Sequence, residues 1–220
     1  MTAPLGLMGG TFDPVHLAHL RLAEEAASEL GLERVRWIPS GNPGHRAAPA
    51  TPARHRLEMV KLAIRDNPRF AVDDAEALGE RAQFTIDTLR RLRTELGAEV
   101  PLVLIIGADQ LHKLDTWRDW RELFERAHFA IGARPGYALA VETLPATVAA
   151  EWRRRAGDAA ALAREPAGRM VAFPMTPLAI AASDIRRRLA VGASVRYLLP
   201  AEVLAYIHTH RLYSEDGRTA

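Results

Sequence analysis

Residues that could do chemistry gather near the start of the chain, in a stretch from Gly9 to His19 that reads GGTFDPVHLAH. Its paired glycines, Gly9 and Gly10, let a phosphate approach the backbone closely. A helix that begins within the stretch would add free N–H groups and the positive end of its dipole. His16 and His19, three residues apart, would share one face of that helix. The stretch therefore predicts an anion site in which two imidazoles donate hydrogen bonds.

Three other interpretations compete for these histidines. A zinc site of the H-E-x-x-H kind needs histidines four apart with a glutamate between them, and Leu17-Ala18 supplies no carboxylate, so we expect no metal ligands here. A dinucleotide loop of the G-x-G-x-x-G kind does not match Gly9-Gly10-Thr11. The third interpretation is a pair of ordinary core histidines, and spacing alone leaves it open.

Short apolar runs alternate with segments of helical periodicity along the chain, as in βαβ units. The expected strands cover residues 5–8, 34–39, 70–73, 101–106, 128–133 and 170–173. This alternation predicts an α/β fold, with a doubly wound, Rossmann-like parallel sheet and helices on both faces. Ligands of such sheets bind beyond the carboxyl ends of the central strands. Gly9 ends one predicted central strand, and Gly107 ends another.

Local signals predict where helices begin and end. Asp13-Pro14 is expected to cap and open a helix that runs to Leu30 and is closed by Gly31. Further helices are expected after Thr51-Pro52, over 85–96, between Ser183 and Gly192, and from Pro200 to Ile207, with surface helices over 138–168. Together these elements predict one domain over residues 1–213, with a small helical C-terminal extension over 183–213 and a flexible tail at 214–220.

The composition excludes several classes of function. The 220 residues hold 29 basic and 27 acidic side chains and no cysteine, which excludes disulfides, thiolate metal sites and cysteine nucleophiles. Nearly balanced charge argues against a nucleic-acid surface, and no apolar run approaches the ~18 residues of a membrane span. We therefore expect a cytoplasmic protein that acts on small molecules without nucleic acid or membrane partners, and the sequence leaves a homo-oligomer open.

The stretch from Gly9 to His19 resembles the H-x-G-H signature of the nucleotidylyltransferase superfamily, with Ala18 where that family usually has glycine. A second superfamily signature, I-S-S-T-x-[IV]-R, is similar to the segment from Ile180 to Arg186. Ala181 and Ala182 replace two of its hydroxyl residues. Ser183 is expected to cap a helix there, so that helix amides and the Arg186 guanidinium could hold a polyphosphate.

Further motifs resemble bacterial nicotinate-mononucleotide adenylyltransferases along nearly the whole chain. The matching segments are Asn42-Pro43-Gly44-His45-Arg46, Arg56 to Met59, Phe84 to Leu89, Ile106 to Asp109 with Thr116-Trp117, and Tyr197 to Pro200 with Tyr206-Ile207 and Leu212-Tyr213. The first of these carries Gly44 where the family's P-P-H-[KR] loop has a second proline.

The resemblance implies a set of site residues. Those expected to bind ATP are Gly9, Gly10, Thr11, Phe12, His16, His19, His45, Arg46, Ile180, Ser183 and Arg186. Those expected to bind the mononucleotide are Gly10, Thr85, Gly107, Asp109 and Trp117. Among these, the catalytic residues would be His16, His19, Arg46 and Arg186.

The implied reaction joins ATP and nicotinate mononucleotide, with Mg²⁺ carried by the ATP phosphates. A phosphomonoester is already mostly an anion at neutral pH, so the reaction requires positioning and charge neutralisation, with no general base. Three alternatives share the first signature: pantetheine-phosphate adenylyltransferases or cytidylyltransferases, a nucleotide sensor without turnover, and a class I aminoacyl-tRNA synthetase fragment. The last needs a lysine-rich loop, and Lys61 and Lys113 are the only lysines.

Overall fold

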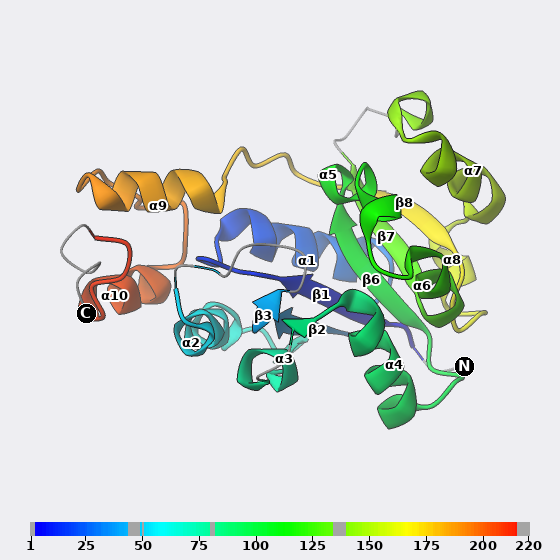
Figure 1. Cartoon of the computed structure of the whole chain (residues 1–220), viewed down its shortest axis with the longest axis horizontal. Helices are drawn as coiled ribbons and strands as arrows, with labels where there is room; N and C mark the ends of the chain where they lie inside the picture. Colours follow the sequence, from blue (N-terminus) through cyan, green and yellow to red (C-terminus); the bar gives the residue numbers. More distant parts are fainter. Residues whose placement is uncertain (1–2, 44–48, 50, 80–81, 134–139, 215–220) are drawn as a thin grey trace.

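Six parallel strands form one twisted sheet in the computed structural model of the chain (Figure 1). The structure describes residues 3–43, 49, 51–79, 82–133 and 140–214. The strands are β1 (Leu5–Gly10), β2 (Arg34–Pro39), β4 (Phe70–Val72), β6 (Leu102–Gly107), β7 (His128–Ala133) and β8 (Met170–Pro174). Each predicted strand is confirmed, two of them with the predicted bounds and the others with differences of one or two residues at their ends. Two short strands, β3 (Asn42–Pro43) and β5 (Ala82–Gln83), pair beside this sheet.

The strand order β4-β2-β1-β6-β7-β8 is that of a doubly wound sheet. The chain adds strands outward from β1 through β2 to β4, then returns to the other side of β1 and adds β6, β7 and β8. The direction of winding therefore reverses between β1 and β6, which is the position where such sheets bind ligands. The predicted Rossmann-like architecture is confirmed.

Helices cover both faces of the sheet (Figure 1). One face packs against α1 (Leu17–Glu29) and α2 (Ala53–Ile64), and α9 (Ala182–Ala190) and α10 (Ala201–Thr209) extend the same apolar cluster beyond the carboxyl end of β1 (Figure 1). The other packs against α4 (Thr85–Leu96), α5 (Ala108–Leu111), α6 (Trp120–Arg126), α7 (Ala146–Arg155) and the 3-10 turn Leu114–Thr116. The short helices α3 (Ala75–Leu78) and α8 (Ala159–Leu162) and the 3-10 turn Val141–Thr143 complete the described elements. In this part of the chain, no helix has the length and apolar character that crossing a membrane requires.

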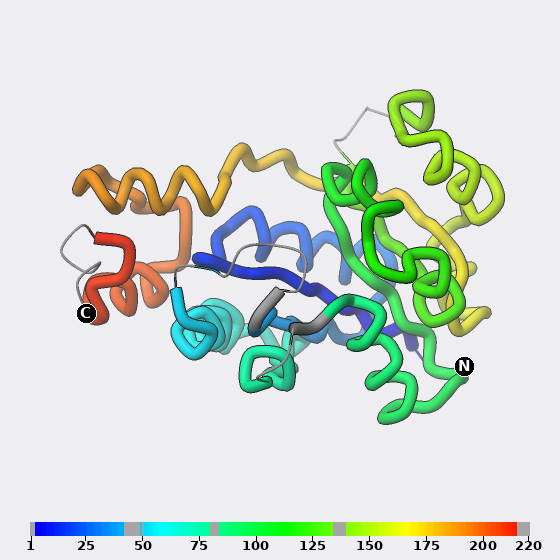
Figure 2. Tube along the Cα trace, viewed as in Figure 1, coloured from blue at the N-terminus to red at the C-terminus, as the bar shows by residue number. Residues whose placement is uncertain are grey.

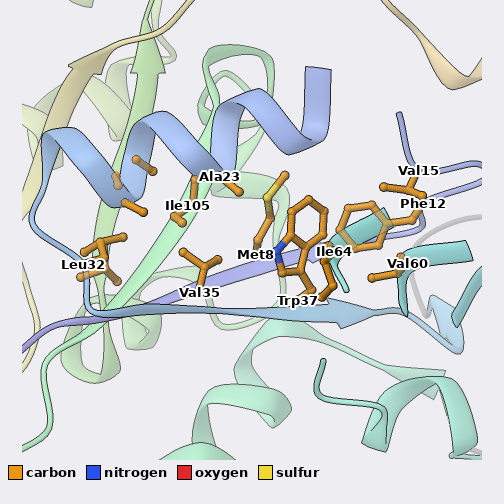
Figure 3. Packing of buried hydrophobic residues seen from close by; sticks show 14 of the residues in the cluster. Met8, Phe12, Val15, Ala23, Leu32, Val35, Trp37, Val60, Ile64 and Ile105 are labelled. Atoms are coloured by element: carbon orange, nitrogen blue, oxygen red, sulfur yellow. The ribbon is translucent and has the colours of Figure 1, made fainter. Parts of the chain in front are cut away.

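Strand side chains alternate between two apolar clusters because successive residues of a strand point to opposite faces. Met8, Trp37 and Ile105 pack toward α1 and α2, where Figure 3 shows the Trp37 indole between Met8 and Phe12. Leu7 and Ile38, their chain neighbours, pack toward α4 and α6. Burial on both faces explains why the sequence of each central strand is an almost continuous apolar run.

The prediction that Asp13-Pro14 opens the first helix is wrong. That helix, α1, begins at Leu17, with His16 at its N-cap, and the Asp13–Pro14 peptide bond is cis. The Asp13 carboxylate accepts a hydrogen bond from Tyr213 instead of from the helix, so tertiary contacts replace the expected cap. The helix does end where predicted, with Gly31 in the left-handed conformation at a φ of 62°.

The N-cap predicted at Ser183 is also wrong. The cap lies two residues earlier, at Ala181, whose carbonyl accepts the first hydrogen bonds of α9 from the N–H groups of Asp184 and Ile185. Ser183 lies within the first turn and its side chain is exposed. The C-terminal segment then runs through α10 back toward the carboxyl end of β1, as the orange and red part of the tube in Figure 2 shows.

Candidate active site at the divergence of the central strands

The two central strands separate at their carboxyl ends. Pairing between β1 and β6 stops at Leu7 and Leu104, whereas β1 stays paired with β2 as far as Gly10, and β6 with β7 as far as Gly107. The loops that follow Gly10 and Gly107 therefore leave the sheet on either side of this opening (Figure 1). The candidate site is built at this point.

His16 and His19 are stacked at the start of α1. Their ring centroids lie 3.6 Å apart with 18° between the planes. The backbone N–H of His16 donates to Nδ1 of His19 at 3.2 Å. Because Nδ1 of His19 accepts this bond, a neutral His19 ring carries its proton on Nε2 and can donate it to a ligand. Nδ1 of His16 is buried without a protein partner.

Burial holds both imidazoles neutral in the free protein. It lowers the pKa of His16 to about 4. Burial also lowers the pKa of His19 to about 3, with a further contribution from neighbouring His16. Two neutral rings that can donate hydrogen bonds lie at the positive end of the helix dipole, a combination that suits an anion.

The glycine pair has two different roles. A Cβ added to Gly10 would lie 2.8 Å from Cζ of Phe12, so a glycine is needed where that ring packs. Phe12 has a φ of 50°, and its ring meets His19 edge-on at 5.1 Å. A Cβ on Gly9 would meet nothing within 4 Å, so the backbone of Gly9 is open to an approaching group.

Arg56 joins the loops around the site, although it is not among the site residues predicted from the sequence. Its side chain is buried and donates to the carbonyls of Thr11 (2.7 Å), Ser40 (2.6 Å), Gly41 (2.8 Å) and Thr51 (3.1 Å). The loop after β1, the loop after β2 and the start of α2 are thereby held together. A sequence signal existed, because helical spacing places Arg56 on the same buried stripe as Met59 and Val60.

Arg186 reaches the same loop from α9. Its Nη1 donates to the carbonyl oxygen of Asp13 at 2.6 Å, which brings the guanidinium to the segment just before His16. Ile180 packs against the core cluster beside α1, whereas Ser183 is exposed in the first turn of α9. Arg186 is therefore the member of this motif that the structure brings to the histidine loop.

The residues predicted for the mononucleotide lie at the other strand end. Gly107 ends β6, and Asp109 folds back over it, since a Cβ on Gly107 would lie 2.7 Å from Oδ1 of Asp109. The exposed Asp109 carboxylate accepts from Nε2 of Gln110 at 2.8 Å. It is thus accessible to the hydroxyl groups of a ligand.

Thr85 and Trp117 lie on segments that meet. Thr85 is the first residue of α4, and Trp117 follows the turn Leu114–Thr116. The guanidinium of Arg118 lies 4.8 Å from the centroid of the Phe84 ring, so the neighbours of the two predicted residues are in contact. The half-buried Trp117 indole packs against the same apolar cluster as Phe84.

Two predicted residues, His45 and Arg46, lie outside the described residues, as does Gly44. Within the described ranges, no group of three or more His, Asp or Glu side chains could hold a metal ion. The carboxylate nearest in sequence to the histidine pair, that of Asp13, is buried against Tyr213. The groups around the pair therefore suit phosphate oxygens better than a bare cation.

Comparisons with known proteins agree on one family. The sequence model described as cytidylyltransferase-like matches residues 7–188. A protein of Dechloromonas aromatica named "Probable nicotinate-nucleotide adenylyltransferase" is 52% identical over 97% of this chain and 99% of its own length. A protein of the same name from Laribacter hongkongensis is 46% identical over 97% and 96%. The chain belongs to the nicotinate-nucleotide adenylyltransferase family.

A solved structure supports the fold of this family member. The Plasmodium falciparum nicotinic acid mononucleotide adenylyltransferase in complex with NaAD has a TM-score of 0.72, at 15% identity, over 96% of this chain and 97% of the other. As a nicotinate-nucleotide adenylyltransferase family member the protein is an enzyme, a nucleotidyltransferase. The class of function expected from the sequence motifs is thereby confirmed.

Proposed function

We propose that this enzyme transfers the adenylyl group of ATP to nicotinate mononucleotide, giving nicotinate adenine dinucleotide and pyrophosphate in NAD biosynthesis. The observation that carries the proposal is the stacked pair of neutral imidazoles at the N-terminus of α1, beside the opening between β1 and β6. The names of the two bacterial relatives support a nicotinate nucleotide as the acceptor of an adenylyl group.

ATP would lie with its phosphates over Gly9 and the first turn of α1. The open backbone of Gly9 allows close approach, and Nε2 of His19 can donate to an α-phosphate oxygen. His16 would donate beside it. Arg186 would neutralise charge on the departing pyrophosphate, together with His45 and Arg46. ATP would arrive as its magnesium complex, because Mg²⁺ keeps several waters and is commonly held by substrate phosphates.

Nicotinate mononucleotide would occupy the β6 side of the opening. Trp117 offers a flat surface for the pyridine ring, and Asp109 can accept from the ribose hydroxyls. The first turn of α4, at Thr85, presents free amides suited to the nicotinate carboxylate. The exposed carboxylate of Asp109 and the half-buried indole of Trp117 support these roles.

The reaction itself is an in-line displacement. An oxygen of the mononucleotide 5′-phosphate forms a bond to the α-phosphorus of ATP, and the bond from that phosphorus to the β-phosphate bridging oxygen breaks. The electron pair leaves with pyrophosphate. Because the nucleophile is already an anion, the site needs no base, which agrees with the low pKa values of the two histidines.

A pyrophosphate-release assay tests the proposal. Purified protein is given ATP and Mg²⁺ with nicotinate mononucleotide, nicotinamide mononucleotide or phosphopantetheine. We expect release with nicotinate mononucleotide at a kcat/KM at least tenfold above that for the other two. Preference for phosphopantetheine would assign the enzyme to another adenylyltransferase class. ATP binding without release from any acceptor would favour a nucleotide sensor.

A further inference from the structure

The last described helix leads to a residue that contacts the histidine loop. The phenol of Tyr213, which follows α10, donates to Oδ1 of Asp13 at 2.6 Å across 200 residues of sequence. Asp13 is only 6% exposed, and it lies three residues before His16. The hydrogen bond therefore ties the C-terminal segment to a buried part of this loop.

A second and a third contact from the C-terminal part converge on this loop. Nη1 of Arg186 donates to the carbonyl oxygen of the same Asp13 at 2.6 Å. The N–H of Leu17, the first residue of α1, donates to the carbonyl of Leu198 at 3.0 Å. The segment between Phe12 and His19 is thus held through the Asp13 side chain and through its backbone. The residues that hold it all follow the last strand of the sheet in sequence.

The chemistry of the Tyr213–Asp13 contact makes it persistent. Burial, together with the negative charge of Asp13, raises the pKa of Tyr213 well above its ordinary value, so the phenol stays protonated and donates throughout the working pH range. The buried Arg56 guanidinium lies near both groups, and its charge favours the Asp13 carboxylate. Phe12 and Tyr213 both have left-handed backbones, with φ of 50° and 66°, a conformation that surrounding contacts must maintain in residues other than glycine.

We propose that Tyr213 is a positioning residue for catalysis, which acts through Asp13 to hold the His16–His19 pair and Arg186 in the geometry that the ATP phosphates require. Tyr213 touches no substrate in this arrangement. The inference rests on the proposed function for its kinetic test, since the affected step is adenylyl transfer. The proposal gives the C-terminal end of the chain a role in catalysis, although this end lies outside the two phosphate-binding motifs.

Tyr213→Phe tests the proposal, because it removes only the phenolic oxygen. We expect kcat to fall about tenfold and the affinity for ATP to weaken, as for the loss of one hydrogen bond to a buried charge. KM for the mononucleotide should change less than twofold. The ¹⁵N resonances of the His16 and His19 rings should move, and the melting temperature should stay within a few degrees of the wild-type value.

Tyr206→Phe is the matched control. Its phenol lies on α10 and is hydrogen-bonded to Nδ1 of His55 at 2.9 Å, away from the histidine loop. This variant should keep wild-type kinetics and wild-type imidazole resonances. A tenfold loss in both variants would overturn the proposal, and so would an unchanged kcat for Tyr213→Phe. Equal losses toward both substrates with a lower melting temperature and unmoved resonances would also overturn it, since the bond would then only stabilise the fold.

Asp13→Asn provides a second test if Tyr213→Phe does not fold. It retains an oxygen that can accept from Tyr213 but removes the charge, so kcat should fall about threefold with the fold intact, and a wild-type kcat would overturn the proposal. These outcomes can be told apart from a failure of the proposed function, in which the wild type itself would not release pyrophosphate. If the wild type releases no pyrophosphate, ATP titration calorimetry and the imidazole resonances of wild type and Tyr213→Phe still decide whether Tyr213 positions the loop.

Discussion

His16 and His19 stack face to face, with ring centroids 3.6 Å apart. At that separation two protonated rings would repel each other, so the free protein holds the pair neutral and leaves Nε2 of His19 as a donor. The pair is therefore arranged to meet negative charge.

Removing one ring of the pair should reduce turnover. We expect His19→Ala to lower kcat by about 10²- to 10³-fold, the usual effect of losing one preorganised donor to a transition state. Steady-state pyrophosphate release measures it. His208→Ala, which changes an exposed histidine of α10, is the control and should be neutral. A loss of less than about fivefold in folded His19→Ala would remove His19 from the catalytic machinery.

The low pKa values of the pair predict how stability depends on pH. The folded-state pKa values are about 4 and about 3, below the 6.5 of an unfolded histidine, so the unfolded chain binds more protons as the pH falls. The stability that the two neutral rings contribute is full above about pH 6.5 and is lost progressively as the pH falls through about 4 for His16 and about 3 for His19. In denaturant titrations between pH 7 and 5, His16→Gln should therefore show a shallower loss of unfolding free energy than the wild type. If the unfolding free energies of the two proteins fell in parallel with pH, the prediction would be wrong.

The two glycines should respond differently to a methyl group. Gly10→Ala forces Phe12 to move and should lower both the melting temperature and activity, because the added Cβ would lie 2.8 Å from the ring. Gly9→Ala meets no protein atom and should melt like the wild type. If phosphates approach the backbone there, Gly9→Ala should still weaken ATP binding about tenfold or more, as measured by calorimetry. An unchanged affinity for ATP would show that the phosphates do not lie against the backbone of Gly9.

Trp117 should affect only one substrate. We expect Trp117→Ala to raise KM for nicotinate mononucleotide about tenfold by removing the surface for its ring, while KM for ATP changes less than twofold. Trp152→Ala is the control, since the half-buried Trp152 indole lies on α7 and packs against the same apolar cluster. Equal effects of Trp117→Ala on both substrates would show that the indole is structural.

Arg56 should be needed for the shape of the site. Arg56→Met removes a buried cation that donates to four backbone carbonyls, and we expect it to lower the free energy of unfolding by about 3 kcal/mol or more. Arg56→Lys restores the charge but cannot reproduce the planar fork of donors, so it should recover only part of this loss. Urea denaturation measures both variants. Full recovery by lysine would mean that charge alone matters.

Much of the fold could be predicted from local signals. Apolar runs of four to six residues predicted all six strands of the sheet, and helix 85–96 was predicted with its closing Gly97. The errors fall at helix starts. Asp13-Pro14 and Ser183 resemble caps in sequence. In the structure, however, the Asp13 carboxylate accepts from Tyr213, and the carbonyl of Ala181 accepts from the first bonded N–H groups of α9. A cap signal is weak, about 1 kcal/mol, and tertiary contacts readily override it.

For the site, spacing alone indicated that His16 and His19 share a helix face, and the motif resemblance indicated which anion they would meet. Packing decided the rest. The ring stacking and the tautomer of His19 are local, but they depend on side-chain geometry that spacing does not give. The bonds of Arg56 to Thr11, Ser40 and Gly41 and the approach of Tyr213 to Asp13 join segments far apart in the sequence. Periodicity and helix signals act over a few residues and so can be read from the sequence. Contacts across up to 200 residues depend on how every intervening element packs, and only the tertiary structure determines them.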